Sequence, residues 1–434
     1  MPEGLDKQMA ECSSRNTDLH RLMLMCKTEA QVIYVVCVGA GDAFINRYWP
    51  ILRMRAALGS LKLLVADEEP LRELVQSKVS DAKASGEQLA ASRLEQRYKE
   101  FVDDAANSPN VRFVNVKDEK DRRWYDHIRA DVVFALVPDE VHIRVAKQWL
   151  KRATLVLVEK PYNRRLEEAV EFEHDMRFMM NHIGGDVPAT WVCSFDHYLS
   201  KIHEYVFNRD KHQLFNRIGR LTKVEFAILE AGPLELWRAG SLQAGMIYDL
   251  FSHVLAMLSI ELDLSTFGHG LVRNIRVAKH KPSLQEREFP GDTFASFDFR
   301  LRDRQGVLVD VLGVVGKGVG SKDEKYLTLV GESGKITCDL DPSGTRQICI
   351  EEASSGKAAS PIYQVGLGHE EFLQTLLSGR YAEQPIGGLS GVTAIEVLRI
   401  MNRIREGIPA TIYTYDVGTP RDQIAGQATG ITLQ

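Results

Sequence analysis

The chain has 434 residues, 44% of them hydrophobic and 26% charged, and its net charge is −5 at pH 7. This length predicts two or three domains with cores of their own, and the weak acidic charge argues against a nucleic-acid-binding protein. No apolar run approaches the roughly 20 residues that a membrane helix needs. The first 29 residues lack the apolar segment of a signal peptide, and the six cysteines show neither a CxxC pair nor metal-ligand spacing. We therefore expect a cytoplasmic protein with reduced thiols, no bound metal and no membrane partner.

The first predicted strand runs directly into a glycine turn. Residues 32–38 form one apolar run, which is typical of a strand buried on both faces of a parallel sheet. A Gly-Ala-Gly turn and a helical segment follow, although Phe44 stands where the GxGxxG pattern has its third glycine. The N–H groups of such a turn and the dipole of the next helix can bind a pyrophosphate. The predicted cofactor contacts in this segment are Gly39, Gly41, Asp42 and Ala43.

A second strand, over residues 61–66, ends on Asp67, which is 28 residues after Gly39. In a dinucleotide-binding fold this is the place of the acid that accepts the ribose hydroxyls. A carboxylate there repels a 2′-phosphate, so NAD is favoured over NADP as the cofactor. The alternative interpretation of Asp67 is a solvated acid in a turn.

Strands and helices then alternate as far as residue 160. A charged helical segment over residues 70–107 is longer than an ordinary crossover helix and predicts a surface insertion. Pro138 closes the fourth strand and is a predicted cofactor contact. His142 follows near that strand end and could touch the cofactor, but we favour a histidine on a helix face. The further strands of this doubly wound parallel sheet are predicted at residues 111–116, 131–137 and 155–158.

The strand at residues 155–158 ends in Glu159-Lys160-Pro161. Proline cannot donate to a strand ladder, and it disfavours a helical conformation of the lysine before it. Lys160 is therefore predicted to be extended at the mouth of a cleft, with Glu159 and Lys160 as cofactor contacts. The alternative is an ordinary surface lysine at a strand end.

Two cations lie one helical turn apart in the next part of the chain. A strand at residues 190–195 leads to Asp196, a plausible helix N-cap, with His197 and Lys201 at positions i and i+4 after it. Two cations near a helix N-terminus oppose its dipole, so an anion bound between them would stabilise both. We predict that His197 and Lys201 hold an anionic group of a substrate. A structural histidine beside a solvated lysine is the alternative.

From residue 221 onward β-rich runs replace the alternation of strands and helices, which predicts a separate α+β domain on one large, mostly antiparallel sheet. A helix at residues 244–258 carries Asp249 and His253, spaced so that the carboxylate can hydrogen-bond the imidazole. An open sheet face predicts a homodimer or homotetramer. Residues after Pro420 are polar and are expected to be loosely held. The four predicted parts are an extension (1–30), a dinucleotide-binding domain (31–160), a substrate and oligomerisation domain (161–415) and a tail (416–434).

These motifs resemble a known superfamily. Gly39-Ala40-Gly41, Glu159-Lys160-Pro161 and the Asp249/His253 pair are similar to the signature of the Gfo/Idh/MocA oxidoreductases, which act on sugars and cyclitols with NAD(P). Glu159-Lys160-Pro161-Tyr162 and the Asp-His-Tyr-Leu-Ser-Lys segment at 196–201 also resemble glucose-6-phosphate dehydrogenases. Those enzymes are longer and usually have a basic residue in place of Asp67. The sheet domain, with its predicted turn at residues 316–318, is more similar to Gfo/Idh/MocA.

The resemblance implies a role for each motif residue. Lys160 would contact the sugar hydroxyl and the nicotinamide, and His253 would be the general base. Asp249 would share this site, and Asp196 would orient the base. The substrate-binding residues implied in this way are Lys160, His197, Lys201, Asp249 and His253.

The predicted function is therefore an NAD(P)-dependent dehydrogenase that moves a hydride between a sugar, in the first instance a sugar phosphate, and the nicotinamide. The first alternative is a Gfo/Idh/MocA-type dehydrogenase of a free sugar, a cyclitol or a nucleotide sugar. A second alternative is a non-catalytic regulator that keeps only the dinucleotide site, and a third is a structural subunit of an assembly.

Overall fold

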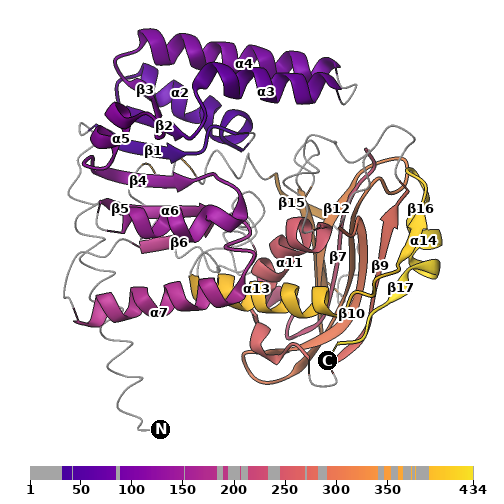
Figure 1. Ribbon diagram of the computed structural model, residues 1–434. Coiled ribbons are helices and arrows are strands. Elements are labelled where there is room, and N and C mark those ends of the chain that lie inside the picture. Colours follow the sequence, from indigo (N-terminus) through magenta and orange to yellow (C-terminus); the bar gives the residue numbers. More distant parts are fainter. Residues whose placement is uncertain are drawn as a thin grey trace.

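Two β-sheets lie side by side in the computed structural model and organise the chain (Figure 1). Among the described residues, no helix has the length and the apolar character that crossing a bilayer requires. The structure describes residues 32–41, 43–84, 88–150, 152–182, 189–193, 206, 214–232, 245–268, 271–281, 291–340, 347–352, 360–364, 373, 377 and 391–433.

The first sheet is entirely parallel, and we call it the parallel sheet. Its strand order is β3-β2-β1-β4-β5-β6, so the order reverses direction between β1 and β4. The middle strands are buried on both faces because helices cover each side, which explains their unbroken apolar runs. Its strands are β1 (Ile33–Val38), β2 (Leu61–Asp67), β3 (Val111–Asn115), β4 (Ala130–Ala135), β5 (Ala153–Glu159) and β6 (Ala189–Cys193).

The parallel sheet continues past the domain boundary that we predicted at residue 160. β6 pairs with β5 from Leu155↔Ala189 to Glu159↔Cys193, and α7 connects the two strands. The Glu159-Lys160-Pro161 segment therefore lies within the first domain, between two of its strands. The helices of this domain include η1 (Phe44–Tyr48), α2 (Trp49–Ala57), α5 (Glu119–Tyr125), η2 (Asp139–Val141), α6 (His142–Trp149) and α7 (Leu166–His182).

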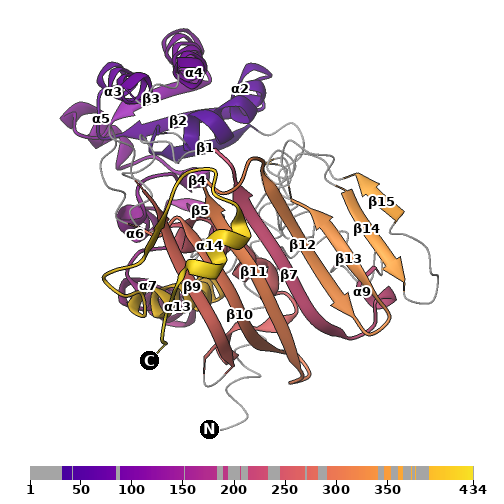
Figure 2. The same ribbon diagram turned by 90° about the vertical axis from the view of Figure 1, so that its right-hand side faces the viewer.

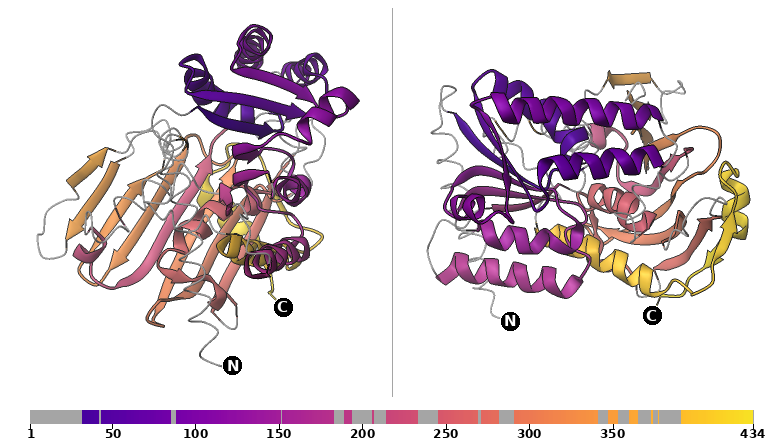
Figure 3. Two further views of the ribbon diagram at one scale, coloured as in Figure 1. Left: turned by 90° about the vertical axis from the view of Figure 1, so that its left-hand side faces the viewer. Right: turned by 45° about the horizontal axis from the view of Figure 1, so that its top comes forward.

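The charged segment at residues 70–107 forms a helical hairpin of α3 (Leu71–Ala84) and α4 (Gln88–Asn107). The two helices lie side by side (Figures 1 and 3). On α4, the hydroxyl of Tyr98 donates to the carbonyl oxygen of Ala40 at 2.9 Å, and Phe101 packs against Phe44 with ring centroids 5.1 Å apart. The hairpin thus supports the glycine turn, and Phe44 fills the core where the full glycine pattern would leave space.

The second sheet, which we call the large sheet, has eleven strands and is mostly antiparallel. Its order is β15-β14-β13-β12-β7-β11-β10-β9-β16, with β17 on β9 and β8 on β10; β7 and β11 pair in parallel. Its strands are β7 (Leu221–Glu230), β8 (Leu262–Asp263), β9 (Val272–His280), β10 (Phe294–Asp303), β11 (Leu308–Lys317), β12 (Glu324–Gly331), β13 (Gly334–Asp339), β14 (Gln347–Glu352), β15 (Ser360–Gln364), β16 (Tyr413–Tyr415) and β17 (Thr429–Gly430).

The expectation of a loosely held C-terminal tail is wrong. α14 (Arg421–Gln427) lies on the outer face of the large sheet (Figure 2), and β17 pairs with β9. The side chain of Ile424 is fully buried in a small core with Phe294 and Tyr415. Apolar residues such as Ile424 and Ala428 anchor this otherwise polar segment to the large sheet. The tail covers part of the face that we expected a second subunit to bury, and the homo-oligomer stays a prediction.

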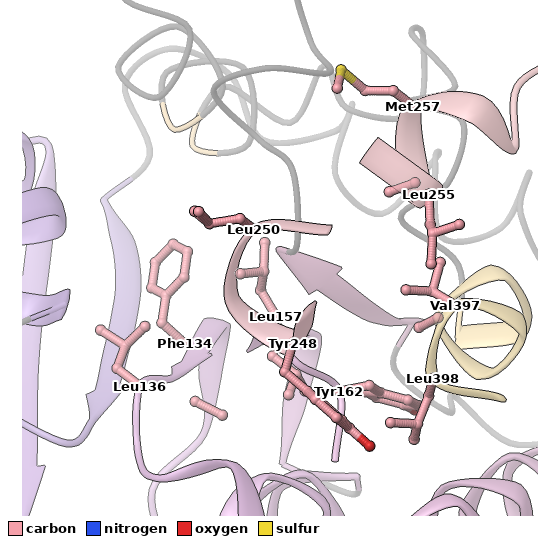
Figure 4. Packing of buried hydrophobic residues seen from close by; sticks show 14 of the residues in the cluster. Phe134, Leu136, Leu157, Tyr162, Tyr248, Leu250, Leu255, Met257, Val397 and Leu398 are labelled. Carbon is pink, nitrogen blue, oxygen red and sulfur yellow. The ribbon is translucent and has the colours of Figure 1, made fainter. Parts of the chain in front are cut away.

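The two domains share one hydrophobic core. Phe134 and Leu157 of the parallel sheet, Leu250 of η4 (Ile247–Phe251) and Val397 of α13 belong to the same cluster (Figure 4). α13 (Gly391–Glu406) packs against α7 and β6 of the first domain and also against α11 (Ser252–Leu258). This core places η4 and α11 next to the carboxyl end of β5. The remaining described helices are α9 (Leu214–Arg217) and η5 (Leu264–Thr266).

Candidate active site

The carboxyl ends of the parallel strands bring the predicted cofactor residues to one edge, where the strand order reverses. Gly39 has φ +99°, and a Cβ there would lie 2.6 Å from the carbonyl oxygen of Leu136. At Gly41, no described atom lies within 4 Å of such a Cβ. The chain itself therefore requires glycine at residue 39, whereas residue 41 faces open space that a phosphate group could approach.

Asp67 ends β2 beside this turn and is half-buried. Its Oδ2 accepts the N–H of Ala40 at 2.8 Å, and its Oδ1 accepts the N–H of Glu69 at 3.0 Å. Each carboxylate oxygen has a further lone pair, so both can still accept a ribose hydroxyl. The carboxylate is thus already oriented at the turn before any ligand binds.

Two more predicted cofactor residues border the same edge. Ala43 is half-buried immediately before η1, and Pro138 is exposed after β4. Asp42 lies outside the described residues.

Lys160 follows β5, and its main chain is held by Glu159. The N–H of Lys160 donates to Oε2 of Glu159 at 3.1 Å, and Oε1 of the same carboxylate accepts the hydroxyl of Tyr48 at 2.8 Å. Glu159 is buried. A buried carboxylate needs donors of this kind, and here they come from the protein.

The helical segment that carries Asp249 is fixed at its start. The carbonyl oxygen of Asp292 accepts the N–H of Met246 at 3.0 Å, and its carboxylate accepts the N–H of Ile247 at 3.1 Å. Burial raises the pKa of Asp292 to about 7. Tyr248 donates its hydroxyl to Asn402 on α13. Together these contacts hold η4 against both the large sheet and α13.

Lys160 and Asp249, predicted separately, meet across the domain interface. Nζ of Lys160 donates to the carboxylate of Asp249 and, at 2.8 Å, to its carbonyl oxygen. Nζ of Lys317 lies 3.4 Å from the other carboxylate oxygen. Burial alone raises the pKa of a carboxyl group, but Lys160 and Lys317 outweigh it, so the pKa of Asp249 is well below its ordinary value. Asp249 is therefore an anion shared by two lysines.

The ion pairs continue from Lys317 into the large sheet. Lys317 lies 3.2 Å from Glu230, whose other carboxylate oxygen lies 3.0 Å from Lys325. Lys325 in turn lies 3.2 Å from the exposed Asp323. Burial raises the pKa of Glu230, but the two lysines lower it more, so the net shift is downward. We call Lys160, Asp249, Lys317, Glu230 and Lys325 the charge chain; their charges alternate.

Lys317, Glu230 and Lys325 were missed by the sequence analysis. Residues 316–318 were interpreted as a turn, but Lys317 is the last residue of β11 and pairs with Glu230 at the end of β7. For Glu230 and Lys317 the signal was present, since each ends an apolar strand just before a turn, whereas Lys325 lies at the start of β12. What the sequence did not show is that β7 and β11 are parallel neighbours, which puts the two charges at one edge.

His253 lies on α11, one turn after Asp249, and is buried at 4% exposure. The imidazole of His253 is also among the groups that lower the pKa of Asp249, after the two lysines. Lys160, Asp249 and His253 are thus brought together. Asp196, His197 and Lys201 lie outside the described residues, so the predicted anion site and the second candidate for orienting the base stay predictions.

Comparisons with known proteins identify the fold. No sequence model of a protein family matches the chain, and no curated protein is detectably similar to it in sequence. A glucose-6-phosphate 1-dehydrogenase from Mycobacterium avium is 15% identical, with a TM-score of 0.60 over 91% of this chain and 96% of that one. A levoglucosan dehydrogenase in complex with NADH and levoglucosan is 15% identical, with a TM-score of 0.58 over 87% and 97%. A 3-ketoreductase from Actinomadura kijaniata in complex with NADP is 13% identical, with a TM-score of 0.53 over 89% and 99%.

The chain has the same fold as these three enzymes. This fold combines a Rossmann-like parallel sheet with a large, mostly antiparallel sheet, so the predicted fold class is confirmed, and the predicted resemblance to the Gfo/Idh/MocA oxidoreductases holds at the level of the fold. At this sequence identity the likeness is one of fold, so the activity has to be argued from the site.

Proposed function

We propose that the protein is an NAD(P)-dependent oxidoreductase that acts on a CH–OH group of a sugar or a sugar phosphate. The observation that carries this proposal is the contact between Lys160 and Asp249, with His253 buried beside them, at the edge where the parallel sheet carries its glycine turn and Asp67. Buried titratable groups of opposite charge at such an edge are typical of a catalytic site.

The turn at residues 39–41 and Asp67, which together we call the nucleotide edge, fit a dinucleotide. A Cβ at Gly41 would enter open space, and the carboxylate of Asp67 is held ready beside the turn. The dinucleotide would therefore be held by the turn at residues 39–41 and by Asp67, with the nicotinamide toward Lys160. When bound, the nicotinamide supplies the hydride acceptor or donor. Because a carboxylate repels a 2′-phosphate, we propose NAD in preference to NADP.

The chain's own residues supply the proton chemistry. His253 removes the proton of the substrate hydroxyl, oriented by Asp249 or by Asp196. The ammonium of Lys160 stabilises the developing alkoxide by charge and by a hydrogen bond. Lys160 can turn from Asp249 toward a substrate without leaving that carboxylate unpaired, because Lys317 lies beside its other oxygen. The site thus keeps its buried anion compensated while Lys160 acts.

For the substrate we propose a sugar phosphate, held by His197 and Lys201. A second candidate is a neutral sugar, a cyclitol or a nucleotide sugar, and the charge chain favours it. Its three lysines face Asp249 and Glu230, and Lys325 also pairs with Asp323, so the described part of the site offers no excess of cations. A phosphate needs such an excess, and we propose that His197 and Lys201, outside the described residues, supply it.

The test is an absorbance scan at the reduced-nicotinamide band with a panel of sugars, sugar phosphates, nucleotide sugars and cyclitols. We expect turnover with NAD and a higher kcat/KM for a phosphorylated sugar than for its free form; equal values would favour the second candidate. Lys160→Ala and His253→Ala should each lower turnover by roughly 100-fold or more. NAD binding should be largely retained in both variants. Near-normal turnover in either of them would refute the mechanism.

A further inference from the structure

His142 is buried between two strand ends of the parallel sheet. It is the first residue of α6 and is 1% exposed. Its Nδ1 lies 2.8 Å from the carbonyl oxygen of Pro161, and its Nε2 lies 2.8 Å from that of Val137. Both ring nitrogens thus face the main chain of the protein, rather than solvent or a cofactor.

The imidazole continues the sheet beyond its last backbone pair. β4 and β5 pair as far as Ala135 and Val158. Beyond these residues Pro161 has no N–H with which to extend the ladder. A buried carbonyl without a donor costs free energy, and the ring nitrogens of His142 face the carbonyls of Pro161 and Val137 at this end of the ladder, so the ring can donate to one of them.

One of these carbonyls lies beside Lys160, and the other lies beside the proposed cofactor-binding edge. Pro161 directly follows Lys160, and Val137 directly precedes Pro138 at the nucleotide edge. Lys160 is already held at its N–H by Glu159 and at its Nζ by Asp249. A bond from His142 to Pro161 holds the same residue from its carboxyl side.

We propose that His142 is a positioning residue for Lys160, and that its hydrogen bond to the carbonyl of Pro161 sets where the end of β5 presents the lysine. The catalytic meaning of this inference rests on the proposed function, but the positioning itself can be measured without turnover.

The bond to Pro161 is the decisive one. Burial lowers the pKa of His142, and its contacts with the carbonyls of Pro161 and Val137 and the charges of Asp139 and Glu159 oppose that shift only in part. A neutral imidazole has one N–H, so it donates to one of its two carbonyls. An asparagine amide nitrogen occupies about the place of Nδ1, and a glutamine amide nitrogen about that of Nε2. His142→Asn can therefore restore the bond to Pro161, and His142→Gln the bond to Val137.

The experiment measures the acetylation rate of Lys160 by acetic anhydride in the full-length protein without ligand, by mass spectrometry. His142→Phe keeps a ring and removes both donors. We expect it to raise the labelling rate of Lys160 about tenfold, the factor that corresponds to one lost buried hydrogen bond. Trp149→Phe is the matched control, because it removes a buried bond of the same helix, from Nε1 to the hydroxyl of Tyr125 at 3.0 Å. The control should destabilise the fold and leave the labelling of Lys160 unchanged.

The two amide variants show which of the two carbonyl bonds protects Lys160. We expect His142→Asn to restore most of the protection of Lys160 and His142→Gln to restore little. Equal labelling in His142→Phe and wild type, or in His142→Phe and Trp149→Phe, would overturn the proposal, as would rescue by glutamine alone. If His142→Phe fails to fold, the contrast between asparagine and glutamine still decides. Absence of turnover in the wild type with every substrate would refute the proposed function and leave these labelling results intact.

Discussion

The nucleotide edge and the charge chain both border the proposed site, but they are built in different ways. At the nucleotide edge, the glycine turn and Asp67 come from a single strand-helix-strand unit, and the carboxylate is held by main-chain N–H groups. In the charge chain, Lys160 just after β5 and residues of η4, β7, β11 and β12 meet across two sheets and are held mainly by ion pairs between side chains.

This difference determines how each region responds to the substitution of one of its residues. The side chains of Lys160 and Lys317 are 9% and 8% exposed, so removing Asp249 leaves the buried Lys160 without its carboxylate partner and Lys317 with Glu230 alone. Removing the half-buried Asp67 frees two backbone N–H groups, one on the buried Ala40 and one on the exposed Glu69, and leaves no charged partner behind. We therefore expect the charge chain to fail as a unit, and the nucleotide edge to lose ligand affinity while it stays folded.

Asp249→Ala should have the largest effect. Removing one partner of a buried ion pair typically costs about 3–5 kcal/mol in the free energy of unfolding. We expect a loss of this size in urea titrations, together with a loss of turnover. Asp323→Ala, at the exposed end of the same ion pairs, is the control and should cost less than about 1 kcal/mol. Similar losses in the two variants would mean that the charge chain is not a cooperative unit.

The two glycines of the turn should separate folding from binding. Gly39→Ala places a Cβ against the carbonyl of Leu136 at positive φ, so we expect a destabilisation of about 1–3 kcal/mol. Gly41→Ala meets open space and should leave the stability unchanged. It should nevertheless weaken NAD binding roughly tenfold or more, about 1.4 kcal/mol, if a phosphate approaches there. Calorimetric titration with NAD checks this, and unchanged affinity in Gly41→Ala would remove the turn from the cofactor site.

Asp67→Ala sharpens the comparison further, because it should change cofactor choice and cost less stability than Asp249→Ala, since it frees one buried N–H group and no buried charge. We expect wild-type protein to use NAD in preference to NADP. In the variant this preference should be smaller, because NAD binds more weakly and the 2′-phosphate of NADP is no longer repelled by a carboxylate. The kcat/KM values for the two cofactors measure it. A wild-type preference for NADP of about tenfold, or 1.4 kcal/mol, would show that the role assigned to Asp67 is wrong.

The smallest effect on turnover is expected from Asp292→Asn, which keeps the acceptor for Ile247. The pKa of Asp292 is raised by burial to about 7, above that of an unfolded aspartate. Its contribution to stability is therefore complete below about pH 4 and is lost as the pH rises to about 7. Asparagine does not titrate, so the melting temperature of the variant relative to wild type should rise by several degrees between pH 5 and pH 8. A difference that stays constant with pH would contradict the raised pKa.

Much of the nucleotide edge could be predicted because its determinants are local. An apolar run, a glycine turn and an acid at the end of the next strand follow one another in the chain, and strand periodicity and turn chemistry act over that range. The same local reasoning placed Lys160 at a strand end before Pro161, and Asp249 and His253 one turn apart on a helix. It failed for the tail after Pro420, whose polar composition concealed the burial of Ile424.

The sequence by itself thus determined which strand ends carry charge, and the tertiary structure decided which of those charges meet. The helical spacing suggested that the carboxylate of Asp249 could hydrogen-bond the imidazole of His253. In the structure the same carboxylate also lies between Lys160 and Lys317. Glu230 and Lys317 became partners only when β7 and β11 paired in parallel, and His142 reached two carbonyls only when β4 and β5 lay side by side. The physical reason is that ion pairs and strand pairing depend on the register of segments far apart in the chain, and no local pattern specifies that register.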